Sequence, residues 1–318
     1  MKKKSIFILV AVTLMVLLFG GCGNIARSDV HISEKNTAGF SSVDVTTSFS
    51  SIEFVSSDRY GFEIFVPGSF APEWDITNGR LTIRENTNRA IVSLNAFSPQ
   101  YYVKVFYPAG SGFNDISLAS ASGRIELPQM DVAYLDIRSS SGRVDAGAEK
   151  SANVSIDTSS GSITFSGSGD NVNLESSSGN VQSVIYECGS VNVTTSSGSI
   201  NLTGKGETAT ALTVNTMSGR IDIDGVAWRD ITARTNSGTT AISGELLGNT
   251  FVETSSGSVN ISVNGSPSQY GYTLTPNSGS IHWNGDRMAS PALSSGSFDN
   301  HITVDTASGG IRVSFSKG

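Results

Sequence analysis

A Ser-Gly pair that recurs at a nearly constant spacing constrains this chain more than any other feature. Successive glycines of the pair are 19, 19, 18, 19, 21, 19, 19, 22 and 30 residues apart. They are Gly123, Gly142, Gly161, Gly179, Gly198, Gly219, Gly238, Gly257, Gly279 and Gly309. Such a period is typical of repeat architectures, in which each repeat packs only on its neighbours.

Apolar residues alternate on both sides of each pair. The residue five places before the glycine is apolar in all ten copies. The residues seven before, two after and four after it are apolar in nine. Alternation of period two predicts strands with one buried face. Because the apolar positions before and after the glycine differ in parity, we expect a bend or bulge there, where glycine permits an unusual backbone angle or a close approach.

Hydroxyl residues accompany the bend. Ser stands immediately before the glycine in all ten copies, and Ser or Thr stands three before it in nine. We expect both side chains to point into the corner and to satisfy backbone groups that the bend leaves unpaired.

These patterns predict an all-β fold, a single β-solenoid with coils of about 19 residues and Ser-Gly at a corner of each coil. In such a stack, like residues of successive coils form ladders, with apolar ladders inside. An antiparallel sandwich of hairpins is the alternative, but hairpins do not require a fixed period.

The solenoid domain is predicted to span residues 31–318, with degenerate first coils over 31–110 and regular coils over 111–318. The segment 284–300, "NGDRMASPALSSGSFDN", is interpreted as a loop-like insertion. The strand after Gly309 is expected to seal the end of the stack, where unpaired backbone groups would otherwise be exposed.

The first residues resemble an export signal. Three lysines (Lys2, Lys3 and Lys4) precede a short apolar run and the sequence "LFGGC", which ends at Cys22. This sequence resembles the lipobox of bacterial lipoproteins. The resemblance implies a signal peptide at 1–21, a lipidated Cys22, a tether at 22–30 and an extracytoplasmic location on the cell membrane or cell surface.

Charge and cysteine content restrict the partners. Without the three lysines of residues 1–21, 18 basic residues face 28 acidic ones, so the remaining chain carries a formal charge of −10. Nucleic acid and anionic lipid surfaces both favour basic proteins and are therefore not expected as partners. Cys188, the second of two cysteines, is predicted to be a small apolar filler without a disulfide partner.

The serial "SSGxI" corners, together with "NGRLTIRE" and "YYVKVFYP", resemble a bacterial family of β-solenoid domains whose members are labelled "putative adhesins". The resemblance covers residues 40–318. It implies stacked coils and attachment to the membrane or export, and it carries no catalytic residues.

The sequence contains no motif that predicts a catalytic mechanism. The three histidines are scattered, and no Cys/His cluster predicts a metal site. Several aspartates lie in different repeats without a calcium-binding motif. We therefore expect no metal, no cofactor and no catalytic residue.

Paired charges offer an alternative interpretation as a polysaccharide lyase or hydrolase. Arg124 and Glu126, and likewise Arg143 and Asp145, share a strand face in adjacent repeats. Two carboxylates on one face are the usual equipment for glycoside cleavage. Opposite charges that keep a long sheet soluble explain the same pattern.

Aromatic residues provide a candidate binding surface at Tyr101, Tyr102, Phe106 and Tyr107. Alternate residues of this strand point to opposite faces, and each face carries an aromatic side chain. Whichever face is buried, the other therefore exposes an aromatic side chain to a sugar or a protein. The sequence thus favours a non-enzymatic cell-envelope lipoprotein that binds a glycan or an envelope or surface protein, or that serves as a purely structural module.

Overall fold

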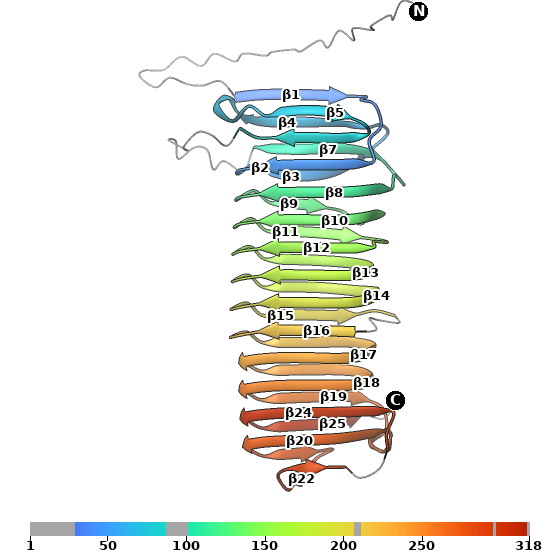
Figure 1. Ribbon diagram of the computed structural model, residues 1–318, viewed down its shortest axis with the longest axis vertical. Helices are drawn as coiled ribbons and strands as arrows, with labels where there is room; N and C mark the ends of the chain where they lie inside the picture. The colour runs from blue at the N-terminus through green and yellow to red at the C-terminus, as the bar shows by residue number, and fades with distance from the viewer. Residues whose placement is uncertain (1–28, 87–100, 207–210, 295–296, 317–318) are drawn as a thin grey trace, which may run out of the picture.

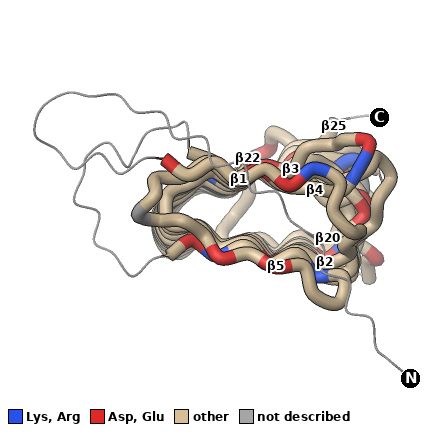
Figure 2. Tube along the Cα trace, turned by 90° about the horizontal axis from the view of Figure 1, so that it is seen from above, with Lys and Arg blue, Asp and Glu red and all other residues tan. Residues whose placement is uncertain are grey.

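The chain forms one tall stack of β-strands arranged in two columns that enclose a shared core (Figure 1). The computed structural model describes residues 29–86, 101–206, 211–294 and 297–316. Seen down the long axis, the chain follows a flattened outline, along which charged residues occur at several places (Figure 2). The described elements are strands and two single-turn 3-10 helices, Gly68–Phe70 and Pro267–Gln269, so the prediction of an all-β, solenoid-like fold is confirmed.

Hydrogen-bond register defines the order of strands in each column. The first column contains, from the N-terminal end, β5 (Glu73–Thr77), β6 (Arg80–Arg84), β2 (Ser42–Thr47), β8 (Phe113–Ser120), β10 (Val132–Ser139), β12 (Asn153–Thr158), the second halves of β13 (Ile163–Ser176) and β14 (Val181–Thr195), β16 (Ala211–Thr216), the second halves of β17 (Ile221–Ser237) and β18 (Thr240–Ser256), β24 (Asn300–Ser308), β20 (Tyr270–Ser278) and β23 (Ala292–Leu293).

The second column faces the first across the core. It contains β1 (Asp29–Lys35), β4 (Gly61–Pro67), β7 (Tyr102–Pro108), β3 (Ser51–Ser57), β9 (Ile125–Leu127), β11 (Val144–Ala148), the first halves of β13 and β14, β15 (Ile200–Gly204), the first halves of β17 and β18, β19 (Val259–Asn264), β25 (Ile311–Ser316), β21 (Ile281–Trp283) and β22 (Asp286–Met288).

Parallel pairing joins equivalent residues of successive repeats. Ile137, for example, pairs with Leu118 on one side and with Ile156 on the other. All ten residues that stand five places before the repeated glycines are buried, and so are the ten that stand two places after it. The predicted inward positions on both sides of the Ser-Gly pair are therefore confirmed, and their side chains fill the interior between the columns.

Both ends of the stack are threaded out of sequence order. At the N-terminal end, β2 lies between β6 and β8, so a later segment covers the first layer. At the C-terminal end, β24 lies between β18 and β20, so an earlier segment covers the last layer. Antiparallel strands β1, β4 and β5 occur at one end and β22 and β23 at the other.

Two expectations about the C-terminal end are wrong. The strand after Gly309, β25, does not seal the stack, because it pairs with β19 and β21 on its two sides. The segment 284–300 is not a simple loop, because it contributes β22 and β23, which lie outermost. These strands have three and two residues, and short edge strands leave few backbone groups unpaired.

The glycines of the Ser-Gly pairs form a column in which each residue lies against the carbonyl oxygen of the one in the adjacent layer. A Cβ added to Gly198 would lie 1.9 Å from the carbonyl oxygen of Gly179, and one added to Gly219 would lie 1.8 Å from that of Gly198. Backbone angle explains few of these positions, since only Gly279 and Gly309 in this column have positive φ. Close approach is therefore the reason for glycine at the corner.

The hydroxyl residues three places before each glycine do line the corner. Thr195 is buried; its Oγ1 accepts a hydrogen bond from the Gly198 N–H at 3.1 Å and donates to the Gly179 carbonyl at 3.3 Å. The expectation fails for the serines immediately before the glycines, such as Ser197, which are exposed. The serine and the hydroxyl residue two places earlier would share a face in a continuous strand, so their opposite orientation shows that the chain bends between them.

The hydrogen bonding of the corner changes after Gly219. The N–H of Gly238 donates to the carbonyl oxygen of Ser256 in the next layer at 3.1 Å. Thr235 Oγ1, at the position equivalent to Thr195, is buried and has no hydrogen-bond partner among the described residues. The glycine spacing is thus retained along the stack while the role of the hydroxyl ladder is not.

We predict that Gly198→Ala lowers the free energy of unfolding by about 3 kcal/mol, because the new methyl group overlaps a backbone oxygen that cannot move without its whole layer. Urea denaturation measures the change. The matched control is Ser197→Ala at the exposed neighbouring position, which we expect to be nearly neutral. Equal stability of the two variants would contradict the close-approach explanation.

We also predict that Thr195→Val and Thr235→Val differ. The first removes two hydrogen bonds from a buried corner and should destabilise the protein by about 1–3 kcal/mol. The second removes a buried hydroxyl that has no described partner, and should be neutral or stabilising. Thermal melting of both variants tests this, and a larger loss for Thr235→Val would show that the corner hydrogen bonds are assigned incorrectly.

Candidate functional site

The paired charges of the enzyme alternative come together on the neighbouring strands β9 and β11, where Glu126 and Asp145 are register partners. Arg124 Nε lies 2.7 Å from Glu126 Oε1, and its Nη2 lies 2.6 Å from Asp145 Oδ2. Arg143 Nε lies 2.8 Å from Asp145 Oδ1. The four side chains form one ion-pair network on the outer face of the second column.

The electrostatics of this network do not match those of a glycoside-cleaving acid. Burial by itself would raise the pKa of Asp145, but hydrogen bonds from Arg143 and Arg124 outweigh it and the pKa is lowered. A general acid in glycoside cleavage instead needs a raised pKa. Since the arginines are more than half exposed, the network is a ladder of solvated opposite charges.

The four predicted aromatic residues divide between the two faces of their strand. Tyr101 and Tyr107 are buried, whereas Tyr102 and Phe106 are half-buried on the outer face. Lys104 lies on that outer face as well, with its Nζ 4.6 Å from the centre of the Tyr102 ring. Tyr102 and Phe106 are therefore the two residues of this set that a ligand can reach from outside.

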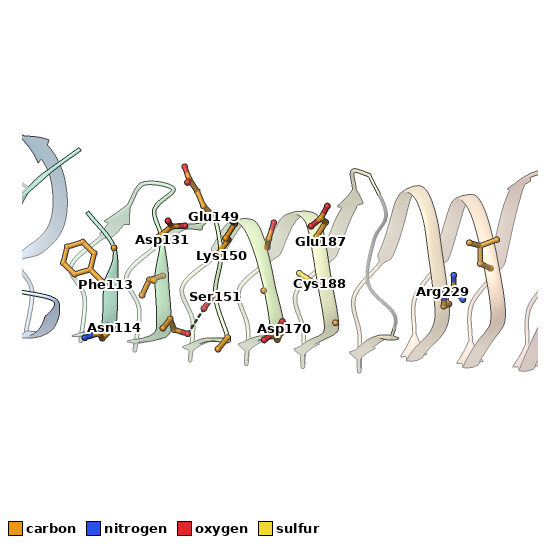
Figure 3. Close-up of a pocket in the computed structure, with 18 residues that line it drawn as sticks. Phe113, Asn114, Asp131, Glu149, Lys150, Ser151, Asp170, Glu187, Cys188 and Arg229 are labelled. Atoms are coloured by element: carbon orange, nitrogen blue, oxygen red, sulfur yellow. Dashed lines mark hydrogen bonds between the residues drawn. The ribbon is translucent and has the colours of Figure 1, made fainter. Parts of the chain in front are cut away.

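A groove lies along the edge of the stack opposite the Ser-Gly corners (Figure 3). It encloses about 1240 Å³ and crosses several successive layers. Its lining residues come from the segments that connect the second column back to the first. They are Gly112, Phe113, Asn114, Asp131, Val132, Ala133, Glu149, Lys150, Ser151, Ala152, Ser168, Gly169, Asp170, Glu187, Cys188, Gly189, Arg229 and Leu247.

Charged side chains flank the groove, and small residues allow a ligand to approach the backbone. Asp131 and Lys150 are bridge partners in adjacent layers, and Glu149, Asp170 and Glu187 add negative charge. The arrangement offers both hydrogen-bond donors and acceptors along one line. An extended chain with alternating polar groups would fit such a line better than a compact ligand would.

Cys188 lies at the floor of the groove and belongs to the core cluster. Burial raises the pKa of its thiol to about 11, so the thiol is protonated near neutral pH. Its prediction as an apolar filler agrees with this environment. Within the described ranges, no group of three His, Cys, Asp or Glu side chains is placed to hold a metal ion.

The groove was not among the sites predicted from the sequence. A signal was present, because Gly112, Asp131, Lys150, Ser168 and Glu187 each stand eleven residues before a repeated glycine. That position is polar or small in these repeats and is aligned across layers by the register of the strands. Residue type varies there, so the position does not stand out as a motif.

Most of the chain matches a known protein family. The model of the family described as Toastrack DUF4097 matches residues 107–184 and 168–314. The chain belongs to this family. The predicted resemblance to the "putative adhesin" solenoids is thereby confirmed. No curated protein matches the chain.

Solved structures cover nearly the whole chain at low similarity. A putative adhesin from Bacteroides fragilis is 13% identical, covers 90% of this chain and 97% of its own, and gives a TM-score of 0.38. A putative cell adhesion protein from Clostridium sporogenes is 10% identical, with 91% and 99% coverage and a TM-score of 0.20. A putative adhesin from Parabacteroides distasonis is 10% identical, with 90% and 96% coverage and a TM-score of 0.34.

The predicted leader and Cys22 lie outside the described residues. Strand β1 begins at Asp29, inside the predicted tether. In the described part of the chain, no helix is long and apolar enough to cross a membrane.

A buried carboxylate covers the N-terminal end of the corner column. Glu85 follows β6, and its backbone N–H donates to the carbonyl oxygen of Thr46 at 2.9 Å. Its side chain is 4% exposed, and Oε2 accepts a hydrogen bond from the Ser48 N–H at 2.6 Å. Burial raises the pKa of Glu85, although the hydrogen bond from Ser48 acts in the opposite direction.

We predict that Glu85→Gln removes a pH dependence of stability. Because the folded-state pKa is raised, this group stabilises the fold fully below the ordinary glutamate pKa of about 4.3, and that contribution is lost as pH rises toward the folded value. The stability of Glu85→Gln relative to the wild type should therefore increase with pH. Denaturation at pH 4 and pH 7 measures it, with exposed Glu175→Gln as control. A difference that does not change with pH would contradict the assignment.

Proposed function

We propose that the chain is a lipid-anchored, extracytoplasmic and non-enzymatic envelope protein that binds an extended glycan or surface partner, in the manner of an adhesin. The basic start, the apolar run and the lipobox-like sequence ending at Cys22 support export and anchoring. A rigid stack of strands supports a binding or scaffolding role, since it holds side chains at fixed intervals.

We further infer that the structural unit is a coil of about 19 residues with Ser-Gly at one corner. The pairing of Ile137 with residues 19 positions before and after it supports this unit. Nine of the ten repeated glycines lie against the carbonyl oxygen of a glycine in the adjacent layer, which supports the placement of the corner.

The edge groove is the observation that carries the proposal. From β8 to β14 it crosses four strand spacings, a length of about 19 Å. Its polar groups lie along the stack, so a chain running in the same direction meets a new set in every layer. A polysaccharide or an extended peptide has that shape, whereas a compact metabolite would contact only one or two layers.

The position of the anchor adds an orientation. The described strands begin at the end of the stack that holds β1, close in sequence to Cys22 (Figure 1). The fourteen described strands of the first column span about 62 Å, so the cap formed by β20 to β23 lies far from the anchored end. The stack would hold its C-terminal cap away from the membrane surface.

The alternative as a polysaccharide-active enzyme has less support. Asp145 is engaged by two arginines and has a lowered pKa, which suits a structural ion pair. The ion-pair network around Arg124 is explained by charges that keep the sheet face soluble, and no feature of the network requires cleavage of a polysaccharide.

The proposal predicts that blocking the groove weakens binding. The mature chain, residues 22–318, is screened on an array of cell-wall, host and plant glycans, with release of reducing ends assayed in the same wells. Ala152→Trp fills the groove and should weaken binding at least about tenfold, a change of about 1.4 kcal/mol.

Thr164→Trp, on the outer face of the second column, is the matched control and should bind as the wild type does. Release of reducing ends would contradict the non-enzymatic assignment. Equal binding by the wild type and both variants would show that the ligand binds outside the groove.

A further inference from the structure

Three basic side chains lie side by side near the C-terminal end of the second column. In register, Arg312 on β25 pairs with His282 on β21, and His282 pairs with Arg287 on β22. Register partners project from the same face of a sheet, so the three side chains form a row, which we call the basic row. Arg312 and Arg287 are exposed, and His282 is half-buried.

The basic row has no counter-charge among the described residues. Eight of the eleven described arginines form an ion pair with an aspartate or glutamate, whereas Arg312 and Arg287 do not. The His282 side chain likewise forms no ion pair or hydrogen bond with a described residue. Like charges directly opposite one another are destabilising in a sheet, so the alignment of three basic side chains in this row is not explained by the stability of the sheet.

Acidic residues are absent from the row itself over several strands, although Asp286 precedes Arg287 on β22. Continuing from Arg312 along the same row, the register partners are Asn260 on β19 and Ala241 on β18. The first acidic residue reached is Asp222 on β17, about 14 Å from Arg312 at the usual strand spacing. Ser314, two residues beyond Arg312, shares a hydroxyl hydrogen bond of 3.3 Å with Ser262. Arginine and these hydroxyl and amide groups together can contact carboxylate, phosphate or sulfate oxygens.

We propose that the basic row binds an anionic polysaccharide, a chain whose carboxylate, phosphate or sulfate groups meet Arg312, His282 and Arg287. This inference rests on the proposed envelope location and adds a ligand class at a surface separate from the edge groove. The row spans two strand spacings, about 10 Å, which suits a few repeating units of such a chain.

Two observations favour a polysaccharide over other polyanions. The remaining chain carries a formal charge of −10, which repels a densely charged nucleic acid beyond the short row. The row also lies in the distal cap of the stack, so the bilayer of the proposed anchor is out of reach. At physiological ionic strength, charges farther apart than about 8 Å are largely screened from one another. The distant acidic residues of the protein therefore do not cancel the attraction of the basic row for an anion.

The test uses the mature chain and measures its affinity for polygalacturonate and heparin, with neutral dextran for comparison. We expect binding to at least one anionic chain, weakening as salt rises. The double variant Arg287→Gln/Arg312→Gln should lose at least about tenfold in affinity. Its melting temperature should not fall, because both arginines are exposed and neither forms an ion pair with a described residue.

The matched control is Arg138→Gln/Arg234→Gln, which makes the same change in net charge on the other column. These arginines pair with Asp136 at 3.0 Å and with Glu253 at 3.1 Å. The control should retain affinity. Equal losses in both double variants, no binding to either anionic chain, or tighter binding to single-stranded DNA or to phosphatidylserine vesicles would overturn the inference.

Binding by the basic row and binding by the edge groove can be tested separately. Ala152→Trp blocks the groove and leaves the basic row intact, so it should retain affinity for the anionic chain. If groove-dependent binding to the glycan array persists while polygalacturonate and heparin do not bind, the inference about the basic row fails and the proposed function stands.

Discussion

The stack depends on a contact between backbones: each glycine of the Ser-Gly pairs lies against the carbonyl oxygen of the residue in the adjacent layer. Across the ten glycines, an added Cβ would lie 1.8–2.1 Å from that oxygen, far closer than any side chain can approach. The first of these oxygens belongs to Ser50, in the layer where the repeated sequence has no glycine. Layers can therefore stack at the usual strand spacing only while this column remains free of side chains.

A fixed corner sets the register of everything else. It aligns inward residues such as Ile137 and Ile156 into apolar ladders, which supply most of the buried surface. It also aligns the outward residues, so that Glu126 and Asp145 share one ion-pair network and Arg312 and His282 share another row. Both proposed binding surfaces follow from the same geometry, because a side chain repeated once per layer becomes a line along the stack.

Part of this structure could be predicted from the sequence, because alternation and spacing are local patterns. The buried positions flanking the repeated glycines were predictable from parity alone. The outward direction of Ser197 was not, because a bend could occur before or after the serine. The order of strands at the ends was hidden for a different reason: alternation says which face of β25 is buried, but it does not specify whether the neighbour is β19, β21 or solvent.

The functional surfaces were harder to predict. Tyr101 was a reasonable candidate by composition, but its strand turns it inward. The groove residues Asp131 and Lys150 become neighbours only through the register of the layers, and so do Arg312 and Arg287 through His282. Asp131 and Lys150 keep the period of 19 but differ in residue type, whereas the basic residues lie in the last layers, where the glycine spacing lengthens to 30.

Residue-resolved hydrogen exchange of the repeated glycines tests the central claim most directly. If the corner is part of the core, the N–H groups of Gly161, Gly179 and Gly198, which are bonded to buried hydroxyls, should exchange as slowly as the neighbouring strand residues, with protection close to that of global unfolding. Rapid exchange at these glycines beside protected strands would show that the corners open independently. The register would then be set by the apolar ladders, and the account given for the glycine column would be wrong.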